Sequence, residues 1–219
     1  MKIYDLSKVL TFEGLNSLTF EDPYLKNRFI CILLSHYPKI TYIDLDTTFT
    51  AYTRSEIIKM DAINKIINIF LLEDKKFHKQ INEIIDSIST SSIVIIDSIN
   101  SFYNLYYKKI DFNFLDNIGE IQHILSNFIM LLLKYCISLK IPLLVTSMIR
   151  YKKEKIWIQS PANTRLIQKK SVTKLHVREN RKSKHIVLDI AEHLKLDLEK
   201  IVITYNNLNQ YSIINNNCD

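Results

Sequence analysis

The sequence predicts an α/β fold: a three-layer core in which a mostly parallel sheet carries helices on both faces and ends in antiparallel strands. Strand-like and helix-like segments alternate over the first two-thirds of the 219 residues, as in parallel sheets joined by crossover helices. Residues 92–96 (SIVII) form a continuous apolar run, which is typical of a strand covered on both faces. After residue 172, several strand-like segments follow one another, which indicates antiparallel strands added to the sheet.

The individual elements follow from local patterns. Residues 9–12 have a weak strand pattern, and we expect a loop from there to Glu21. Asp22 and Pro23 have the pattern of a helix N-cap and first helical position, and Pro38 bars this helix from continuing. Further strands are expected at residues 40–45, 68–72, 92–96, 141–146, 172–178, 185–190, 201–205 and 211–214, and further helices at about 54–67, 81–88 and 116–139.

Length and composition limit the class of protein. A chain of 219 residues fits one domain, spanning residues 1–219. The three cysteines are widely spaced and form no Cys-x-x-Cys pair, so neither a disulfide framework nor a zinc site is expected. The apolar runs are too short to cross a bilayer, and the first ten residues lack the apolar region of a signal peptide. We therefore expect a reduced cytoplasmic protein without a membrane partner, associated with the nucleoid, or a nuclear protein in a eukaryote.

Acidic residues stand at the expected ends of two strands. Asp44 and Asp46 follow one strand and Asp97 follows another. Sites in open α/β sheets lie beyond the carboxyl ends of the strands, and carboxylate oxygens are the ligands that Mg²⁺ prefers. The three residues are therefore a candidate metal cluster. Side chains at strand ends also commonly cap loops, and this is the competing interpretation.

Several segments, taken in order, resemble the archaeal RadA/RadB branch of the RecA-like recombinases over residues 9–208. They are YIDLDTTFTAYTR (residues 42–54), SIVIIDSINSFY (92–103), IPLLVTSMI (141–149), TKLHVREN (173–180) and KHIVLDIAEHL (184–194). The resemblance implies a RecA-like core. It places Asp97 at the Walker B aspartate, Asp46 at the glutamate that positions the attacking water, and Ser147 and Met148 at an Asn-Gln pair that senses the γ-phosphate.

The phosphate-binding loop of that family is missing. Such a loop needs Gly-x-x-x-x-Gly-Lys-Ser/Thr, whereas the corresponding stretch here is EGLNSLTFEDPYLK (residues 13–26). Counting from Gly14, the second glycine, the lysine and the hydroxyl residue are replaced by Thr19, Phe20 and Glu21. Glu21 and Asp22 would repel a triphosphate. We therefore expect no ATPase activity and no bound ATP or Mg²⁺, so Asp44, Asp46 and Asp97 are interpreted as a vestigial Walker B-like cluster.

A strongly basic segment follows the strand at 141–146. Between residues 150 and 184 the chain has twelve Lys/Arg and two Glu, so with a net charge of +6 the remainder carries about four negative charges. We expect a long loop at 149–172, where the family has its second DNA-binding loop. Lysine and arginine release phosphate counterions, and aromatic rings stack on unpaired bases. The candidate nucleic-acid-binding residues are Arg150, Tyr151, Lys152, Lys153, Lys155, Trp157, Arg165, Lys169 and Lys170.

These observations leave several functions open. The leading hypothesis is a non-hydrolysing accessory protein in DNA recombination or repair. Such a protein would bind DNA, preferably single-stranded DNA. It would also bind a RecA/RadA-type recombinase and form a homo- or hetero-oligomer. An alternative is a protein-interaction or regulatory module like degenerate KaiC-like ATPases, without nucleic-acid binding. The basic segment would then be a solvated surface or would dock an acidic protein, with Trp157 as a packing anchor. A third hypothesis is metal-dependent enzyme activity at the three aspartates.

Overall fold

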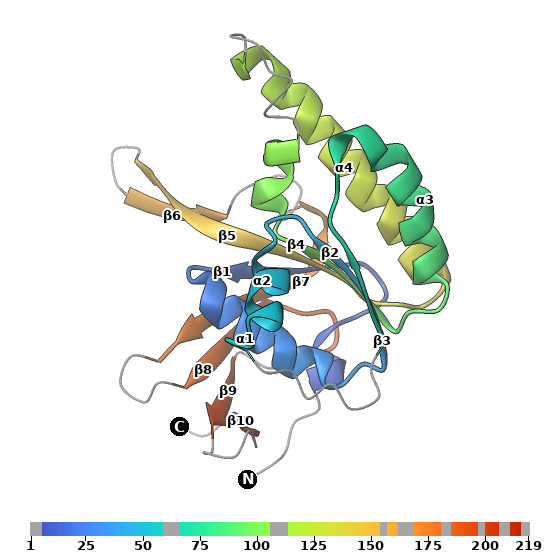
Figure 1. Cartoon of the computed structure of the whole chain (residues 1–219). Coiled ribbons are helices and arrows are strands. Elements are labelled where there is room, and N and C mark those ends of the chain that lie inside the picture. The colour runs from blue at the N-terminus through green and yellow to red at the C-terminus, as the bar shows by residue number, and fades with distance from the viewer. Residues whose placement is uncertain are drawn as a thin grey trace.

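One mixed β-sheet forms the centre of the protein, seen here in a computed structural model that describes residues 6–58, 66–105, 114–153, 157–161, 169–180, 185–196, 200–205 and 211–215. Along the sheet the strand order is β3-β2-β4-β5-β1-β7-β8-β9-β10, and β6 pairs with β5 (Figure 1). The strands from β3 to β7 along this order are parallel, and from β7 to β10 each strand is antiparallel to the next. The predicted mostly parallel sheet with antiparallel C-terminal strands is thus confirmed.

The strands are β1 (Leu15–Phe20), β2 (Lys39–Asp44), β3 (Ile66–Phe70), β4 (Ile93–Asp97), β5 (Leu143–Lys153), β6 (Trp157–Pro161), β7 (Ser171–Glu179), β8 (Ile186–Glu192), β9 (Lys200–Tyr205) and β10 (Tyr211–Asn215). The α-helices are α1 (Pro23–Leu34), α2 (Thr48–Arg54), α3 (Phe77–Ile88) and α4 (Phe114–Ser138). Short 3-10 helices are η1 (Leu6–Val9), η2 (Asp74–Lys76) and η3 (Ile99–Leu105).

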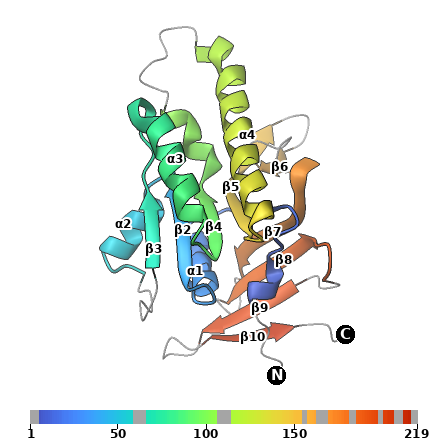
Figure 2. The same cartoon turned by 90° about the vertical axis from the view of Figure 1, so that its right-hand side faces the viewer.

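Helices cover both faces of the parallel strands, which gives the three predicted layers (Figures 1 and 2). Helix α1 and the start of α2 share one buried apolar cluster with one face of the sheet. Helices α3 and α4 share a second cluster with the other face. Neighbouring residues of β4 show the division, because Ile95 belongs to the first cluster and Ile96 to the second. This follows from the two-residue repeat of a strand, in which successive side chains point to opposite faces.

Helix α4 combines the length and apolar composition of a membrane-spanning helix over Gly119–Ser138. One of its faces, however, is buried against α3 and the sheet, with Leu125, Phe128 and Leu132 in the second apolar cluster. Helix α4 is thus amphipathic, with one apolar face packed in the core of the fold.

The first strand and the second helix differ from the expectations. The expected strand at 9–12 is wrong: η1 ends at Val9, and β1 lies at Leu15–Phe20, inside the expected loop. Polar residues interrupt the apolar pattern of β1, but they bond within the fold. Asn16 Nδ2 donates to Leu143 O at 3.0 Å, and Ser17 Oγ donates to Thr173 O at 3.2 Å.

The expected helix at 54–67 is also wrong where the chain is described. Helix α2 ends at Arg54, and β3 begins at Ile66. Two carboxylates at the end of β2 fix the start of α2, because Asp46 accepts from Thr48 N and Asp44 accepts from Thr50 N, at 2.9 and 2.8 Å. Residues 59–65 lie outside the described residues.

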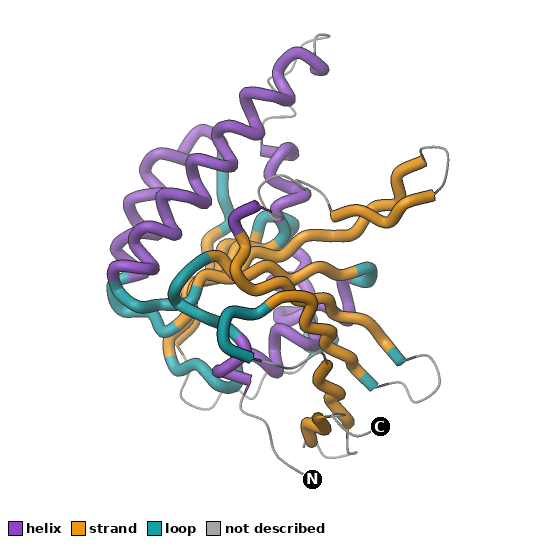
Figure 3. Tube along the Cα trace, turned by 180° about the vertical axis from the view of Figure 1, so that it is seen from behind, coloured by secondary structure: helices purple, strands orange, loops and turns teal. Residues whose placement is uncertain are grey.

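The expected loop at 149–172 is wrong in its described part. Strand β5 continues to Lys153 and pairs with β6 in an antiparallel hairpin, with Ile149 opposite Pro161 and Lys153 opposite Trp157. The hairpin extends away from the body of the sheet, and the view from behind shows it as a two-stranded arm (Figure 3).

Candidate functional site

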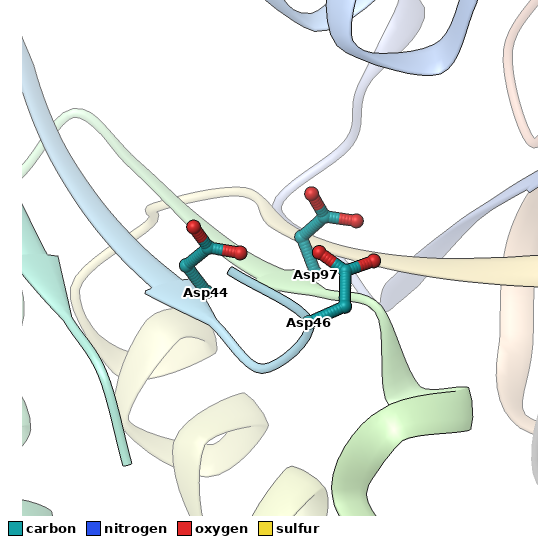
Figure 4. Close-up of side chains that lie close together, drawn as sticks. All are labelled: Asp44, Asp46 and Asp97. Atoms are coloured by element: carbon teal, nitrogen blue, oxygen red, sulfur yellow. The ribbon is translucent and has the colours of Figure 1, made fainter. Parts of the chain in front are cut away.

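The three predicted aspartates meet at the carboxyl edge of the parallel strands. Asp44 ends β2 and is in register with Asp97, which ends β4. Asp46 follows in the turn before α2. One carboxylate oxygen from each lies within 4.8 Å of the others (Figure 4). Neighbouring parallel strands end at one edge, so the sequence was sufficient to bring these side chains together.

A buried lysine, absent from the sequence-based candidates, lies among these carboxylates. Lys26 Nζ is 2.7 Å from each carboxylate oxygen of Asp97 and 3.5 Å from Asp46 Oδ2. It also donates to Thr48 Oγ1 at 3.3 Å. The side chains of Lys26 and Asp97 are both completely shielded from solvent. The ammonium is therefore the direct counter-ion of the predicted metal cluster.

Asp97 accepts further hydrogen bonds from two neutral side chains. Tyr42 Oη donates to its Oδ2, and Thr146 Oγ1 donates to its Oδ1. Burial, followed by the charge of Asp97, raises the pKa of Tyr42 well above its usual value, so the phenol stays a neutral donor. Both carboxylate oxygens of Asp97 thus have two donors within the protein.

The other two aspartates differ in ionisation. Burial raises the pKa of Asp44 to about 6, against the hydrogen bonds that it accepts from Thr50. Burial by itself would raise the pKa of Asp46. The Lys26 ammonium and the hydrogen bonds from Thr48 outweigh this effect of burial, and the pKa of Asp46 is lowered. Asp44 therefore holds its proton to a higher pH than Asp46 does, and between about pH 4 and about pH 6 the favoured arrangement is a protonated Asp44 beside an ionised Asp46.

The turn between β1 and α1, where a phosphate-binding loop would follow the first strand, consists of Glu21 and Asp22. Asp22 is the N-cap of α1 and accepts from Tyr24 N at 2.7 Å, with Pro23 in the first helical turn, as predicted. Counting a loop from Gly14 is wrong, because Gly14 precedes β1 and Thr19 and Phe20 lie within that strand. Two residues cannot wrap a phosphate chain in backbone N–H groups.

A cleft of about 570 Å³ lies beside this turn, at the carboxyl ends of β1 and β7. Its lining includes three carboxylates, Glu21, Asp22 and Glu179, and one guanidinium, Arg178, which is paired with Asp189. A negative lining opposes a polyphosphate. The residues of this edge therefore do not fit the Mg²⁺-nucleotide that the family resemblance implies.

The middle of β5, at Ser147 and Met148, is hydrogen-bonded to Asn100 of η3. Asn100 Oδ1 accepts from Met148 N at 2.8 Å and from Ser147 Oγ at 3.2 Å, while its Nδ2 donates to Met148 O at 3.3 Å. Ser147 is buried, and Met148 packs against the apolar cluster under α1.

The structure separates the candidate nucleic-acid-binding residues into two groups and leaves two of them outside its described part. Arg150, Tyr151, Lys152 and Lys153 form the end of β5, and Trp157 begins β6. Lys169 and Lys170 are exposed just before β7. Lys155 and Arg165 lie outside the described residues.

The sequence analysis missed the residues that bond to the three aspartates: Lys26, Tyr42, Thr48, Thr50 and Thr146. One signal was present for Lys26, since it stands on the buried face of α1, four and seven residues before Ile30 and Leu33. A lysine at such a position is rarely buried without a partner. Its partner Asp97, however, is 71 residues away.

Comparison of the sequence with models of protein families and with curated proteins finds no match.

Proposed function

We propose that this protein is a non-hydrolysing accessory relative of the RecA-type recombinases, and that it binds DNA through the basic hairpin formed by β5 and β6. The observation that carries the proposal is the position of the basic residues. Arg150, Lys152 and Lys153 lie on a two-stranded arm that extends from the sheet, and Trp157 lies opposite Lys153. Basic residues on a projecting arm are suited to binding a phosphate backbone, and an aromatic residue in the paired strand is suited to stacking on an unpaired base.

The carboxyl edge of the sheet supports the absence of ATP hydrolysis. Its aspartates are engaged by Lys26, Thr48 and Thr50, and its β1–α1 turn is two residues long. The sheet is kept, while the side chains at the edge where catalysis would take place bond to one another. Such a fold is suited to binding a partner rather than to hydrolysing ATP. A recombinase as partner, an accessory role in recombination or repair, and a place in the cytoplasm or nucleus belong to the same proposal.

The test measures binding of a fluorescently labelled single-stranded oligonucleotide by anisotropy over a range of salt concentrations. We expect binding at low salt, with an affinity that falls as salt rises. A triple Arg150→Glu, Lys152→Glu, Lys153→Glu variant removes three phosphate-binding cations, so the slope of log K against log salt should become shallower by about 2.

The matched control is a triple Lys75→Glu, Lys76→Glu, Lys79→Glu variant, which changes the net charge equally at exposed lysines of η2 and α3. We expect it to bind nearly as the wild type does. Absence of binding at low salt, or an equal loss in both triple variants, would overturn the proposed DNA-binding arm.

A protein-interaction module similar to degenerate KaiC-like ATPases is the second candidate, and the outer face of α4 favours it. Ile124, Leu131 and Tyr135 lie on that face and are each more than one-third exposed. Neighbouring exposed apolar side chains on one helix are suited to docking a protein. Affinity capture from the source cells, with and without nuclease, separates the two functions. A partner protein bound by α4 should still be captured after nuclease treatment, and it should be lost with an Ile124→Glu, Leu131→Glu variant.

A further inference from the structure

The environment of Lys26 Nζ has the composition of a cation site. Four oxygen atoms surround the ammonium: two from Asp97 at 2.7 Å, Thr48 Oγ1 at 3.3 Å and Asp46 Oδ2 at 3.5 Å. Carboxylate and hydroxyl oxygens are the donors that hard divalent cations take from proteins. The oxygen atoms around Lys26 Nζ are thus of the kind that bind a metal ion, and the ammonium lies where such an ion would lie.

Burial makes a positive charge at this position necessary. Lys26 and Asp97 are 0% exposed, and the side chain of Asp46 is 15% exposed, so water screens these charges poorly. A buried ion whose partner is removed is strongly destabilising. Asp46 and Asp97 together carry two negative charges when ionised, which equals the charge that one divalent cation neutralises.

The local chain geometry fixes the ammonium in place. The two-residue turn brings α1 directly behind β1, which puts Lys26 in the first turn of the helix, beside the strand ends. The Nζ atom also lies 5.0 Å from the centre of the Phe20 ring, at the end of β1. A longer turn of the phosphate-binding kind would place a different part of the chain here.

We infer that Lys26 is a tethered substitute for a metal ion: the chain fills a cation site formed by Asp97, Asp46 and Thr48 with its own ammonium. The native protein accordingly takes no divalent cation between these residues. Removal of the lysine side chain opens the site to one hard divalent cation. This inference holds whether or not the hairpin binds DNA.

The experiment compares the wild type with a Lys26→Ala variant, using Mn²⁺ as a paramagnetic probe. Binding is followed by electron paramagnetic resonance of free Mn²⁺, and stability by the thermal midpoint Tm with Mn²⁺ or with a chelator. For the wild type we expect the same Tm in both conditions and no Mn²⁺ binding that depends on Asp97. For Lys26→Ala in chelator we expect a Tm about 10 °C lower, with much of the loss restored by Mn²⁺ as one ion binds.

Two controls assign the effect to this site. A Lys26→Ala, Asp97→Asn double variant should lose the Mn²⁺-dependent gain in Tm. A Lys174→Ala variant removes the partly exposed ion pair with Glu192 and should show a small change in Tm that Mn²⁺ does not reverse.

Three results would overturn the inference. One is Mn²⁺ binding by the wild type that Asp97→Asn abolishes. Another is a folded Lys26→Ala variant that binds no Mn²⁺. The third is an unfolded Lys26→Ala variant that does not refold when Mn²⁺ is added. If this variant is unfolded in chelator, the inference predicts that circular dichroism shows refolding on addition of Mn²⁺.

Discussion

At the scale of single residues, Asp44 has the least favourable environment for a carboxylate in the site. It is 1% exposed, and two other aspartates lie within 4.8 Å. One of its oxygens accepts from Thr50, while Oδ1 has no donor among the described residues. A proton on Asp44 removes the cost of burying a negative charge there, beside the carboxylates of Asp97 and Asp46. This is the physical meaning of its raised pKa.

The pH dependence of stability should report this proton. The folded pKa of Asp44 is about 6 against 3.8 for the free group, so the folded protein binds more protons than the unfolded one between these values. The free energy of unfolding should therefore fall as pH rises from about 4 to about 6, by up to about 3 kcal/mol from this residue. The pKa of Asp46 is lowered in the fold, so its ionised form stabilises the folded protein. This contribution to the free energy of unfolding is lost only as pH falls below about 4.

An Asp44→Asn variant should remove the decline between pH 4 and 6 and be more stable than the wild type at pH 7. The asparagine keeps an acceptor for Thr50 and carries a donor on its other arm. Urea unfolding over this pH range measures the effect, with Asp86→Asn on the exposed face of α3 as control. An Asn variant that keeps the decline, or is less stable at pH 7, would show that the decline does not come from a raised pKa of Asp44.

At the scale of elements, the junction between β1 and α1 decides how the carboxyl edge is filled. Asp22 satisfies backbone N–H groups at the start of α1, with distances of 2.7 Å to Tyr24 N and 3.4 Å to Leu25 N. The cap lets the helix begin after a turn of only two residues, and so it sets the position of Lys26. A helix start and a buried ion pair therefore depend on the same short turn.

An Asp22→Ala variant should lose about 0.5–2 kcal/mol of stability, because the first N–H groups of α1 lose their acceptor. Asp22→Asn is the matched control, since an asparagine oxygen caps a helix about as well. Urea denaturation of the two variants measures the difference. If alanine and asparagine were equally stable, the cap would contribute nothing, and Lys26 would be positioned by its ion pair alone.

At the scale of the whole molecule, the two apolar clusters share the strands of one sheet. Ile95 and Ile96 are adjacent in β4 and completely buried, yet they belong to different clusters. Loss of packing on one face thus removes support from the same strand on the other. The two layers should unfold together rather than as separate units.

The variants Ile95→Ala and Ile96→Ala test this cooperativity. Each should lower the free energy of unfolding by about 2–5 kcal/mol, as is usual for a large-to-small change in a core, and each should keep one transition with an unchanged m value. Urea unfolding followed by circular dichroism and by tyrosine fluorescence checks this. Ile57→Ala, at a residue 56% exposed, should change stability by less than about 0.5 kcal/mol. A second transition in either core variant would mean that the layers are independent.

The sequence by itself determined the class of the fold and the meeting of the three aspartates. Both depend on short-range information: the repeat of apolar residues within a segment, the N-cap at Asp22, and acidic residues at the ends of parallel strands. The missing Gly-Lys pair is also local, so the absence of a phosphate loop is visible in the sequence. The hairpin was missed because Arg150, Lys152 and Lys153 lack the apolar pattern of a strand, although β5 continues through them.

Only the tertiary structure decided what fills the acidic cluster. Asp97 receives Lys26 from α1, Tyr42 from β2 and Thr146 from β5, over separations of 49 to 71 residues. No local pattern records such pairings, because each depends on where helices and strands come to lie against one another. Taken alone, three carboxylates indicate a metal site. With the buried ammonium of Lys26 between them, Asp46 and Asp97 instead form ion pairs within the chain.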